Sequence, residues 1–164
     1  MALRTVLIFP DSRLRNVAEK ITVFDDTVKT LATDMAETMY AENGIGLAAI
    51  QINVKQRIIT VDISEDRTEL ITLINPEIIA SEGQQICQEG CLSVPEIYAE
   101  VSRAEKITVR AQDVDSKEFS IEADGLLAVC IQHEIDHLDG KVFVDYLSNA
   151  KRQRIQKKLL KRKA

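Results

Sequence analysis

The chain contains only two histidines, and both lie in one pentapeptide, His133-Glu134-Ile135-Asp136-His137. Histidines four residues apart lie on the same face of a helix, where both imidazoles can bind one metal ion. The glutamate between them can then act as a general base for a water molecule that the metal activates. This pattern requires a helix here and a fold that brings a further ligand to it. The alternative is a helix that carries two solvated histidines.

The sequence around the pentapeptide predicts a helix from Gly125 to about Leu138, with Asp124 as its N-cap and Asp139-Gly140 as its stop. Side chains at positions i, i+4, i+7 and i+11 share one face of this helix: Leu126, Cys130, His133 and His137. We therefore expect the metal site to continue into an apolar pocket whose wall includes the first two of these residues. Both can also be ordinary core residues.

A catalytic metal needs a third protein ligand and an open fourth position for water. The chain has no third histidine, so the donor is expected to be a carboxylate or a thiolate. Asp139 is too close to His137, Asp145 lacks the usual context of a metallopeptidase ligand, and Cys130 suits the pocket wall better. Cys91 is therefore the predicted ligand. Two imidazoles and a thiolate suit Fe(II) or Zn(II), whereas Mg(II) and Ca(II) prefer oxygen ligands.

The rest of the chain predicts an α+β fold of mostly antiparallel strands around the metal-binding helix, with a further helix at the C-terminal end. A helix is expected from Asp25 to Glu42, where apolar residues recur at helical spacing and Asn43-Gly44 follows. Strands are expected at 57–63, 70–74, 97–101, 107–111 and 119–123. Turns are expected at Asn75-Pro76, 81–83 and 113–116.

Composition and length favour one domain over residues 1–164. No apolar run approaches the length of a membrane span, and the first residues lack the features of an export signal. Three cysteines are too few for a disulfide scaffold, which favours a reducing cytoplasm. We expect neither a membrane nor DNA as a partner.

Charge is distributed unevenly along the chain. Eight of the 21 basic residues lie in 151–164, which contains no acid, so 13 basic residues face 26 acidic ones in 1–150. A basic C-terminal helix from about 148 to 163 on an acidic body suggests docking to a polyanion. The alternative is a solvated terminal helix.

Three segments together resemble the peptide deformylases of the bacterial type. They are Gly-x-Gly-x-Ala-Ala-x-Gln at 44–51, Glu-Gly-Cys-Leu-Ser at 89–93 and Gln-His-Glu-x-Asp-His-Leu at 132–138. The three motifs occur in the family's order, and the resemblance extends along the whole chain. One departure is Ile50, where many members have proline; it affects little beyond the stiffness of the loop.

The resemblance implies an enzyme that hydrolyses the N-formyl group from the initiator methionine of nascent polypeptides and releases formate. It implies one divalent metal ion per chain on Cys91, His133 and His137, with Fe(II) expected in the cell and Zn, Ni or Co able to replace it. Glu134 would transfer protons. Gln51 and the backbone N–H of Leu92 would stabilise the oxyanion.

Substrate binding follows from the same resemblance. The backbone of Gly46 would pair with the peptide, and the methionine side chain would enter a pocket beside the helix. Its expected walls are Ile45, Leu126, Val129 and Cys130, with a contribution from Cys87. Glu89 is expected to pair with Arg103 and brace the cysteine loop, and Glu96 and Tyr98 are weaker candidates for the mouth of the pocket. The ribosome, whose surface is rich in RNA, is the expected polyanion for the basic helix.

Two alternatives remain open. A zincin-type metallopeptidase shares His-Glu-x-x-His but would need a downstream glutamate or histidine ligand. A non-catalytic, metal-stabilised module bound to the ribosome would need a closed fourth coordination position.

Overall fold

The computed structural model describes residues 2–163, which form three α-helices, seven β-strands and three short 3₁₀ helices. The helices are α1 (Asp26–Ala41), α2 (Gly125–Leu138) and α3 (Asn149–Lys163), and the 3₁₀ helices are η1 (Ser12–Arg15), η2 (Ala49–Ile52) and η3 (Phe143–Tyr146). The strands are β1 (Gly46–Ala48), β2 (Ile58–Val61), β3 (Ile71–Glu82), β4 (Gln85–Cys91), β5 (Val94–Arg103), β6 (Lys106–Gln112) and β7 (Glu118–Asp124).

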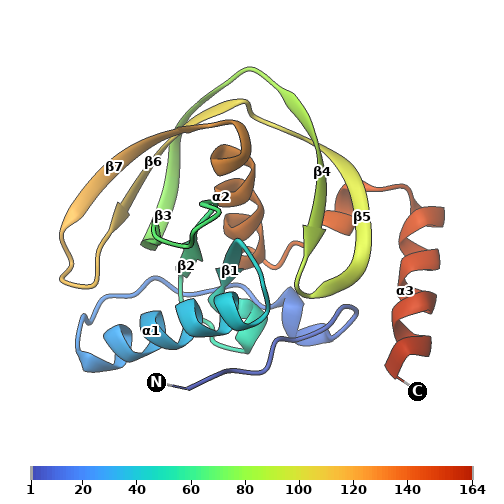
Figure 1. Ribbon diagram of the computed structural model, residues 1–164, viewed down its shortest axis with the longest axis horizontal. Coiled ribbons are helices and arrows are strands. Elements are labelled where there is room, and N and C mark those ends of the chain that lie inside the picture. Colours follow the sequence, from blue (N-terminus) through green and yellow to red (C-terminus); the bar gives the residue numbers. More distant parts are fainter. Residues whose placement is uncertain (1, 164) are drawn as a thin grey trace.

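The named strands form two separate antiparallel sheets. One has five strands in the order β1-β2-β3-β6-β7, and the other consists of β4 and β5 alone. Figure 1 shows α2 between the five-stranded sheet and the β4–β5 pair, with α1 along one end and α3 on the outer side of β5. The predicted α+β fold, with its antiparallel strands around a central helix and its C-terminal helix, is confirmed.

Alternation along the strands explains why two helices can pack on the five-stranded sheet. Successive side chains of a strand point to opposite faces. In β2, Ile59 and Val61 belong to the core cluster that contains residues of α2, whereas Ile58 belongs to the cluster that contains residues of α1. All four residues of β2 are buried for this reason. α2 is therefore enclosed by the fold. An enclosed helix can keep water away from a metal ion that its side chains bind.

Both helices flanking the sheet begin and end close to the predicted residues. The carboxylate of Asp25 accepts a hydrogen bond from the backbone N–H of Thr27, and Asn43 has the positive φ of 58° expected just after a helix. α2 has the predicted bounds, and Asp124 is its N-cap, but the Asp124 side chain makes no capping hydrogen bond.

The predicted turn at Asn75-Pro76 is wrong, because β3 continues through both residues. The pairing of β3 with β6 shifts register between Ile74 and Glu77, and Asn75 has a φ of 52°. The Asn75 side chain accepts from the N–H of Ile21 and donates to its carbonyl oxygen, both at 2.8 Å. A bulge tolerates proline, since the missing N–H is not needed for pairing there.

A third apolar cluster holds the β4–β5 pair and α3 in place. It contains Val94 and Val101 of β5, Phe143 of η3 and Leu159 of α3, with Ile155 packed against it. Only one face of α3 is buried in this way, and its basic side chains up to residue 162 lie outside that face. None of the helices described within residues 2–163 is long and apolar enough to cross a lipid bilayer.

Candidate metal centre

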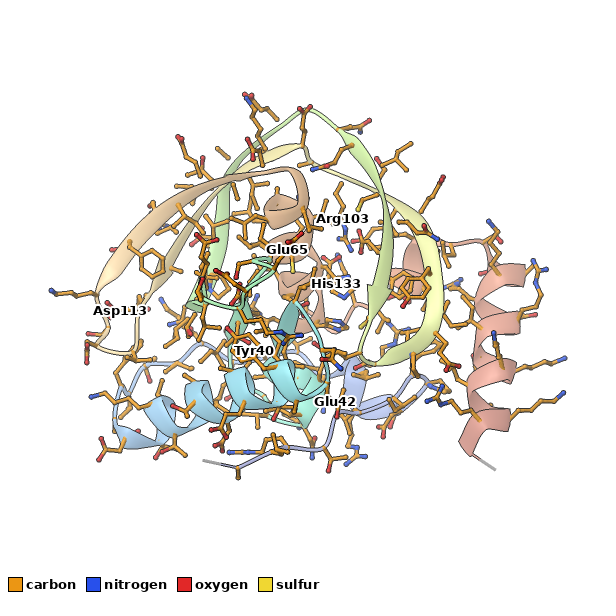
Figure 2. The ribbon with its side chains drawn as sticks, in the orientation of Figure 1. Tyr40, Glu42, Glu65, Arg103, Asp113 and His133 are labelled. Carbon is orange, nitrogen blue, oxygen red and sulfur yellow. The ribbon has the colours of Figure 1, made fainter. Side chains whose placement is uncertain are left out.

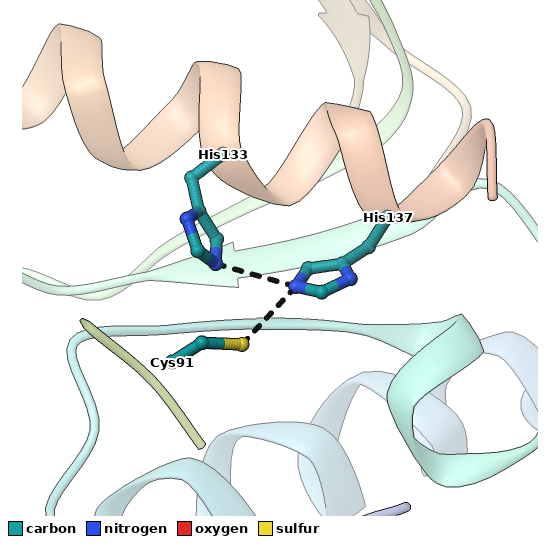
Figure 3. A group of neighbouring side chains, drawn as sticks. All are labelled: Cys91, His133 and His137. Atoms are coloured by element: carbon teal, nitrogen blue, oxygen red, sulfur yellow. Dashed lines mark hydrogen bonds between the residues drawn. The ribbon is translucent and has the colours of Figure 1, made fainter. Parts of the chain in front are cut away.

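Cys91, His133 and His137 come together at the junction of β4 and α2 (Figure 3). Their ligand atoms all lie within 4.8 Å of one another. The Nε2 atoms of the two imidazoles are 3.2 Å apart, and Nε2 of His137 lies 3.4 Å from Sγ of Cys91. The fold thus brings together the three residues that the sequence predicts as metal ligands.

The spacing of these atoms fits a tetrahedral metal site. Metal bonds of about 2.0–2.1 Å to nitrogen and about 2.3 Å to sulfur place tetrahedral ligands roughly 3.4 Å apart for two nitrogens and roughly 3.6 Å apart for nitrogen and sulfur. The observed separations of 3.2 and 3.4 Å lie close to both values. The donor set of two imidazoles and one thiolate suits Zn(II) or Fe(II).

A hydrogen bond at Nδ1 of His133 leaves its Nε2 atom available to the metal site. Nδ1 of His133 lies 2.8 Å from Oε1 of Glu89, which can only accept when it is ionised, so Nδ1 donates and Nε2 keeps its lone pair. A carboxylate behind a metal-binding histidine is the usual outer-shell arrangement. Figure 2 shows His133 and Arg103 in the interior, between α2 and the β4–β5 pair.

Arg103 completes the support behind His133. Its Nε and Nη2 atoms donate to the two oxygens of Glu89 at 2.8 and 2.9 Å, and both side chains are almost fully buried. Burial works to raise the pKa of Glu89, but the hydrogen bonds from Arg103 and His133 outweigh it and hold the pKa below its ordinary value. The predicted pairing of Glu89 with Arg103 is confirmed.

Glu134, the next residue along α2, differs from Glu89 in its hydrogen bonding. Its Oε1 atom is buried without a hydrogen-bond partner among the described residues. Burial, the largest cause, raises the pKa of Glu134 to about 7. A carboxyl group that gains and loses a proton near neutral pH is suited to general acid–base catalysis.

The charges around the three ligands favour a cation between them. Burial alone would lower the pKa of His133, but the negative charges of Glu134 and Cys91 raise it above its ordinary value. Burial lowers the pKa of His137, which keeps that imidazole neutral and able to bind metal. The negative charges around His133 therefore favour a cation at this point, and a metal ion bound at Nε2 would supply it.

Gln51 is positioned beside the cysteine by two neighbours. Its Oε1 accepts from the backbone N–H of Ala48 at 2.9 Å, and its Nε2 donates to Oγ of Ser93 at 3.0 Å and lies 3.6 Å from Sγ of Cys91. The amide is fixed and buried, with its N–H₂ directed toward the site. Leu92 follows Cys91 in the two-residue turn between Cys91 and Val94.

A cavity of about 550 Å³ opens onto these groups. Its lining includes all five residues predicted to bind substrate, which are Ile45, Gly46, Leu126, Val129 and Cys130, together with Cys87, Glu96 and Tyr98. A Cβ atom at Gly46 would lie 2.5 Å from Oε2 of Glu134 and 2.9 Å from Sγ of Cys130, so any larger residue there would displace these side-chain atoms. The contacts of Ser93 and Ala48 with Gln51 were not predicted from the sequence, although Ser93 belongs to the second motif.

Comparisons with known proteins identify the family that this chain is similar to. The family model described as polypeptide deformylase matches residues 3–153. A peptide deformylase from Pseudoalteromonas translucida is 57% identical over 161 residues, which cover 98% of this chain and 96% of that protein. A crystal structure of a peptide deformylase from Legionella pneumophila has a TM-score of 0.94 at 51% identity and covers 99% of this chain and 96% of that one. A peptide deformylase from Ehrlichia chaffeensis in complex with actinonin has a TM-score of 0.94 at 38% identity, with 99% and 98% covered.

Proposed function

This chain belongs to the polypeptide deformylase family, and from that premise we propose which of its residues remove the formyl group and how they do so. The chain is a metal-dependent hydrolase that acts on formyl-methionyl peptides, the N-formylated ends of nascent polypeptides. The zincin-type alternative is not favoured, because the family and the fold both match the deformylases. The observation that carries the residue assignment is Glu134, a buried carboxylate with one oxygen that has no hydrogen-bond partner among the described residues, beside three potential metal ligands.

Cys91, His133 and His137 would hold one divalent metal ion. Bound there, the ion would make water nucleophilic near neutral pH and polarise the formyl carbonyl. We propose Fe(II) as the ion in the cell, with Zn, Ni or Co able to replace it, since the mixed thiolate and imidazole ligands accept all four.

Glu134 then carries the proton through the reaction. Its carboxylate accepts a proton from the water whose oxygen bonds to the formyl carbon. As the bond between that carbon and the methionine nitrogen breaks, Glu134 returns the proton to the departing amine. The products are formate and a methionine with a free amino group. The pKa of about 7 places both protonation states of Glu134 within reach at physiological pH.

Gln51 and Leu92 would stabilise the negative charge that develops on the formyl oxygen. The Nε2 of Gln51 and the backbone N–H of Leu92 both lie next to Cys91. Donors that are fixed before the reaction lower the barrier because they need not reorganise during it, and each contributes about 10²-fold or more in rate. The methionine side chain would occupy the cavity wall formed by Ile45, Leu126, Val129 and Cys130, with its backbone along Gly46.

A direct test compares formate release from a formyl-methionyl peptide with cleavage of an unformylated peptide that has internal bonds. We expect formate release only, and Gln51→Ala should slow it by about 10²-fold while the metal content stays the same. Internal cleavage would favour the zincin alternative instead. A Gln51→Ala variant with unchanged turnover would remove Gln51 from the mechanism.

We further propose that the chain works as one catalytic unit in the cytoplasm and docks on the ribosome through α3. The exposed side chains of this helix include Lys151, Arg154, Lys157, Lys158 and Lys161. Contacts between such residues and RNA phosphates should weaken steeply as salt rises. Substituting glutamate for both Lys157 and Lys158 should abolish co-sedimentation with ribosomes at low salt. The rate of formate release from a short formyl-methionyl peptide should not fall. Equal co-sedimentation of the variant and the parent chain would reject the docking proposal.

A further inference from the structure

The proposed metal ligands come from two parts of the fold that the sheets do not connect. Cys91 ends β4, whereas His133 and His137 lie on α2. Among the described strands, β4 pairs only with β5 and neither joins the five-stranded sheet. The distance from the sulfur to the imidazoles therefore depends on how the β4–β5 pair is fastened to α2.

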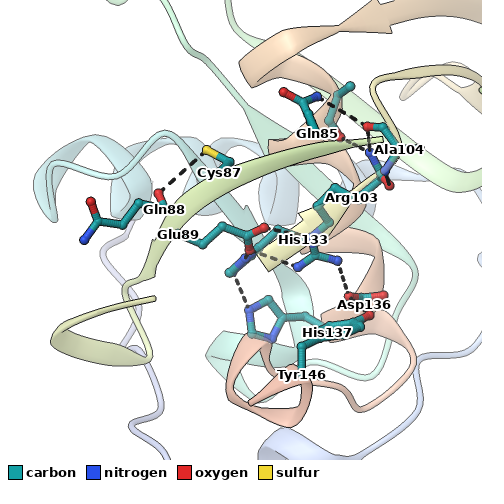
Figure 4. A network of polar contacts seen from close by, with 12 residues as sticks. Gln85, Cys87, Gln88, Glu89, Arg103, Ala104, His133, Asp136, His137 and Tyr146 are labelled. Carbon is teal, nitrogen blue, oxygen red and sulfur yellow. Dashed lines mark hydrogen bonds and ion pairs between the residues drawn. The ribbon is translucent and has the colours of Figure 1, made fainter. Parts of the chain in front are cut away.

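Arg103 connects the two sides of this junction through the three nitrogen atoms of its guanidinium (Figure 4). Nε and Nη2 donate to Glu89 on β4, and Nη1 donates to Oδ2 of Asp136 on α2 at 2.6 Å. Arg103 itself ends β5, and its side chain is only 4% exposed. A buried guanidinium shared by two carboxylates fixes the distance between the strand and the helix.

Tyr146 of η3 holds the outer end of this network in two ways. Its hydroxyl donates to Oδ2 of Asp136 at 2.7 Å, the same oxygen that accepts from Arg103. The guanidinium carbon of Arg103 lies 4.9 Å from the centre of the Tyr146 ring, within the range of a cation–π contact. One side chain thus orients the carboxylate and also limits the tilt of the guanidinium plane.

We infer that Asp136 and Tyr146 are positioning residues for the metal site, acting through Arg103 and Glu89 on His133 and on the strand that carries Cys91. This inference rests on the proposed function and gives a task to the aspartate of the His-Glu-Ile-Asp-His motif, which the mechanism above does not use. It also makes part of the metal site's rigidity depend on Tyr146, a half-exposed residue in another element.

The order of effects follows from the geometry. Asp136→Asn removes one of the two carboxylates on Arg103, so the guanidinium can follow β4 away from α2. Tyr146→Phe keeps the ring beneath Arg103 and removes only the hydroxyl. Loss of an outer-shell partner commonly weakens metal binding by about 10- to 100-fold. We expect release of the metal to accelerate by about tenfold in Asp136→Asn and by about threefold in Tyr146→Phe.

The test uses protein loaded with Co(II), whose visible absorption reports the geometry of the ligands. The rate of Co(II) release to an excess of chelator is measured for the parent chain and both variants. Tyr40→Phe is the matched control, because the Tyr40 hydroxyl makes a similar 2.6 Å bond to Asp62 away from the metal centre. The melting temperature of each metal-free protein is measured in parallel, together with kcat and KM on a formyl-methionyl peptide.

Faster release and an altered Co(II) spectrum in both variants, with release from Tyr40→Phe unchanged, would support the inference. The same variants should lower kcat more than they raise KM. Release at the parent rate from Asp136→Asn and Tyr146→Phe would overturn the inference, whatever happens to the melting temperature. Failure of the parent chain to bind Co(II) through a thiolate would instead refute the proposed metal site.

Discussion

Glu89 and Glu134 both lie buried beside His133, but the surroundings of the two carboxylates differ. We call the first the brace region, formed by Glu89 and Arg103, and the second the cavity floor, formed by Glu134 and Gly46. Both oxygens of Glu89 accept hydrogen bonds, and its pKa is lowered. One oxygen of Glu134 has no hydrogen-bond partner within residues 2–163, and burial raises the pKa of Glu134 to about 7.

The difference shows how a fixed environment on β4 and β5 and a reactive one on α2 can lie beside the same histidine. A carboxylate whose two oxygens both accept hydrogen bonds from charged or polar donors stays ionised and holds a ring in place. A carboxylate that is desolvated without compensation is costly to ionise, and this cost makes it ready to take a proton during catalysis. The brace region therefore stabilises the folded protein, and the cavity floor supplies the group that reacts.

The largest expected effect tests the cavity floor. Glu134→Gln removes the proton acceptor but keeps the shape of the side chain, so turnover of a formyl-methionyl peptide should fall by about 10³-fold. Metal content should not change, since Glu134 is not one of the proposed ligands. At pH 8 the metal-free variant should be at least as stable as the parent chain, because an unpaired buried charge has been removed. Turnover within tenfold of the parent would assign the proton transfer elsewhere.

The same substitution in the brace region should act in the opposite way on stability. Glu89→Gln leaves Arg103 buried without its main counter-charge, which should cost about 3–5 kcal/mol of unfolding free energy. Metal affinity should fall by about 10- to 100-fold, because the ring of His133 loses its acceptor. Urea unfolding and a competitive metal titration measure the two effects. An unchanged unfolding free energy would contradict the distinction between the two regions.

The pH dependence of the metal-free protein should separate the two carboxylates. The folded pKa of Glu134 is about 7 against an ordinary 4.5, so its stabilising contribution is complete below pH 4.5 and is lost as the pH rises through 7. The loss amounts to about 3 kcal/mol. Glu89 has a lowered pKa, so its contribution is present above 4.5 and is lost only as the pH falls through its folded pKa. In unfolding curves between pH 4 and 8, the stability of the parent chain should decline more between about 4.5 and 7 than that of Glu134→Gln; an identical decline in the variant would contradict the assignment.

The smallest effect is expected for an arginine–glutamate ion pair that is exposed to solvent. Arg110 pairs with Glu77 and Glu118 on the exposed face of the sheet. Glu118→Gln should change the unfolding free energy by less than about 0.5 kcal/mol, since water and salt screen such pairs. A loss as large as that of Glu89→Gln would show that burial is not what separates the brace region from an ordinary ion pair.

Sequence reasoning succeeded where a local pattern carries the information. The bounds of α2 follow from its apolar face and its flanking residues, and the family follows from three short motifs. The pairing of Glu89 with Arg103 was also predicted. These features need no knowledge of how distant segments meet.

Sequence reasoning failed where the site itself disturbs the pattern. β4 was missed because its inward positions are polar or small, as in Gln85, Cys87, Glu89 and Cys91, and the usual alternation of apolar residues is absent. Asn75-Pro76 has the composition of a turn, but the Asn75 side chain bonds to Ile21 in a bulge. The network from Arg103 to Asp136 and Tyr146 was missed because it depends on the meeting of distant elements.

The enclosure of His137 has a consequence for the exchange of the metal ion. His137 has no exposed surface, whereas Cys91 and His133 line the cavity. In the described part of the chain, an ion reaching these ligands would enter by the opening that also admits the peptide. Metal exchange and peptide hydrolysis would then use the same opening. A protein molecule with a bound peptide would retain its metal ion, and only molecules without a peptide would exchange theirs.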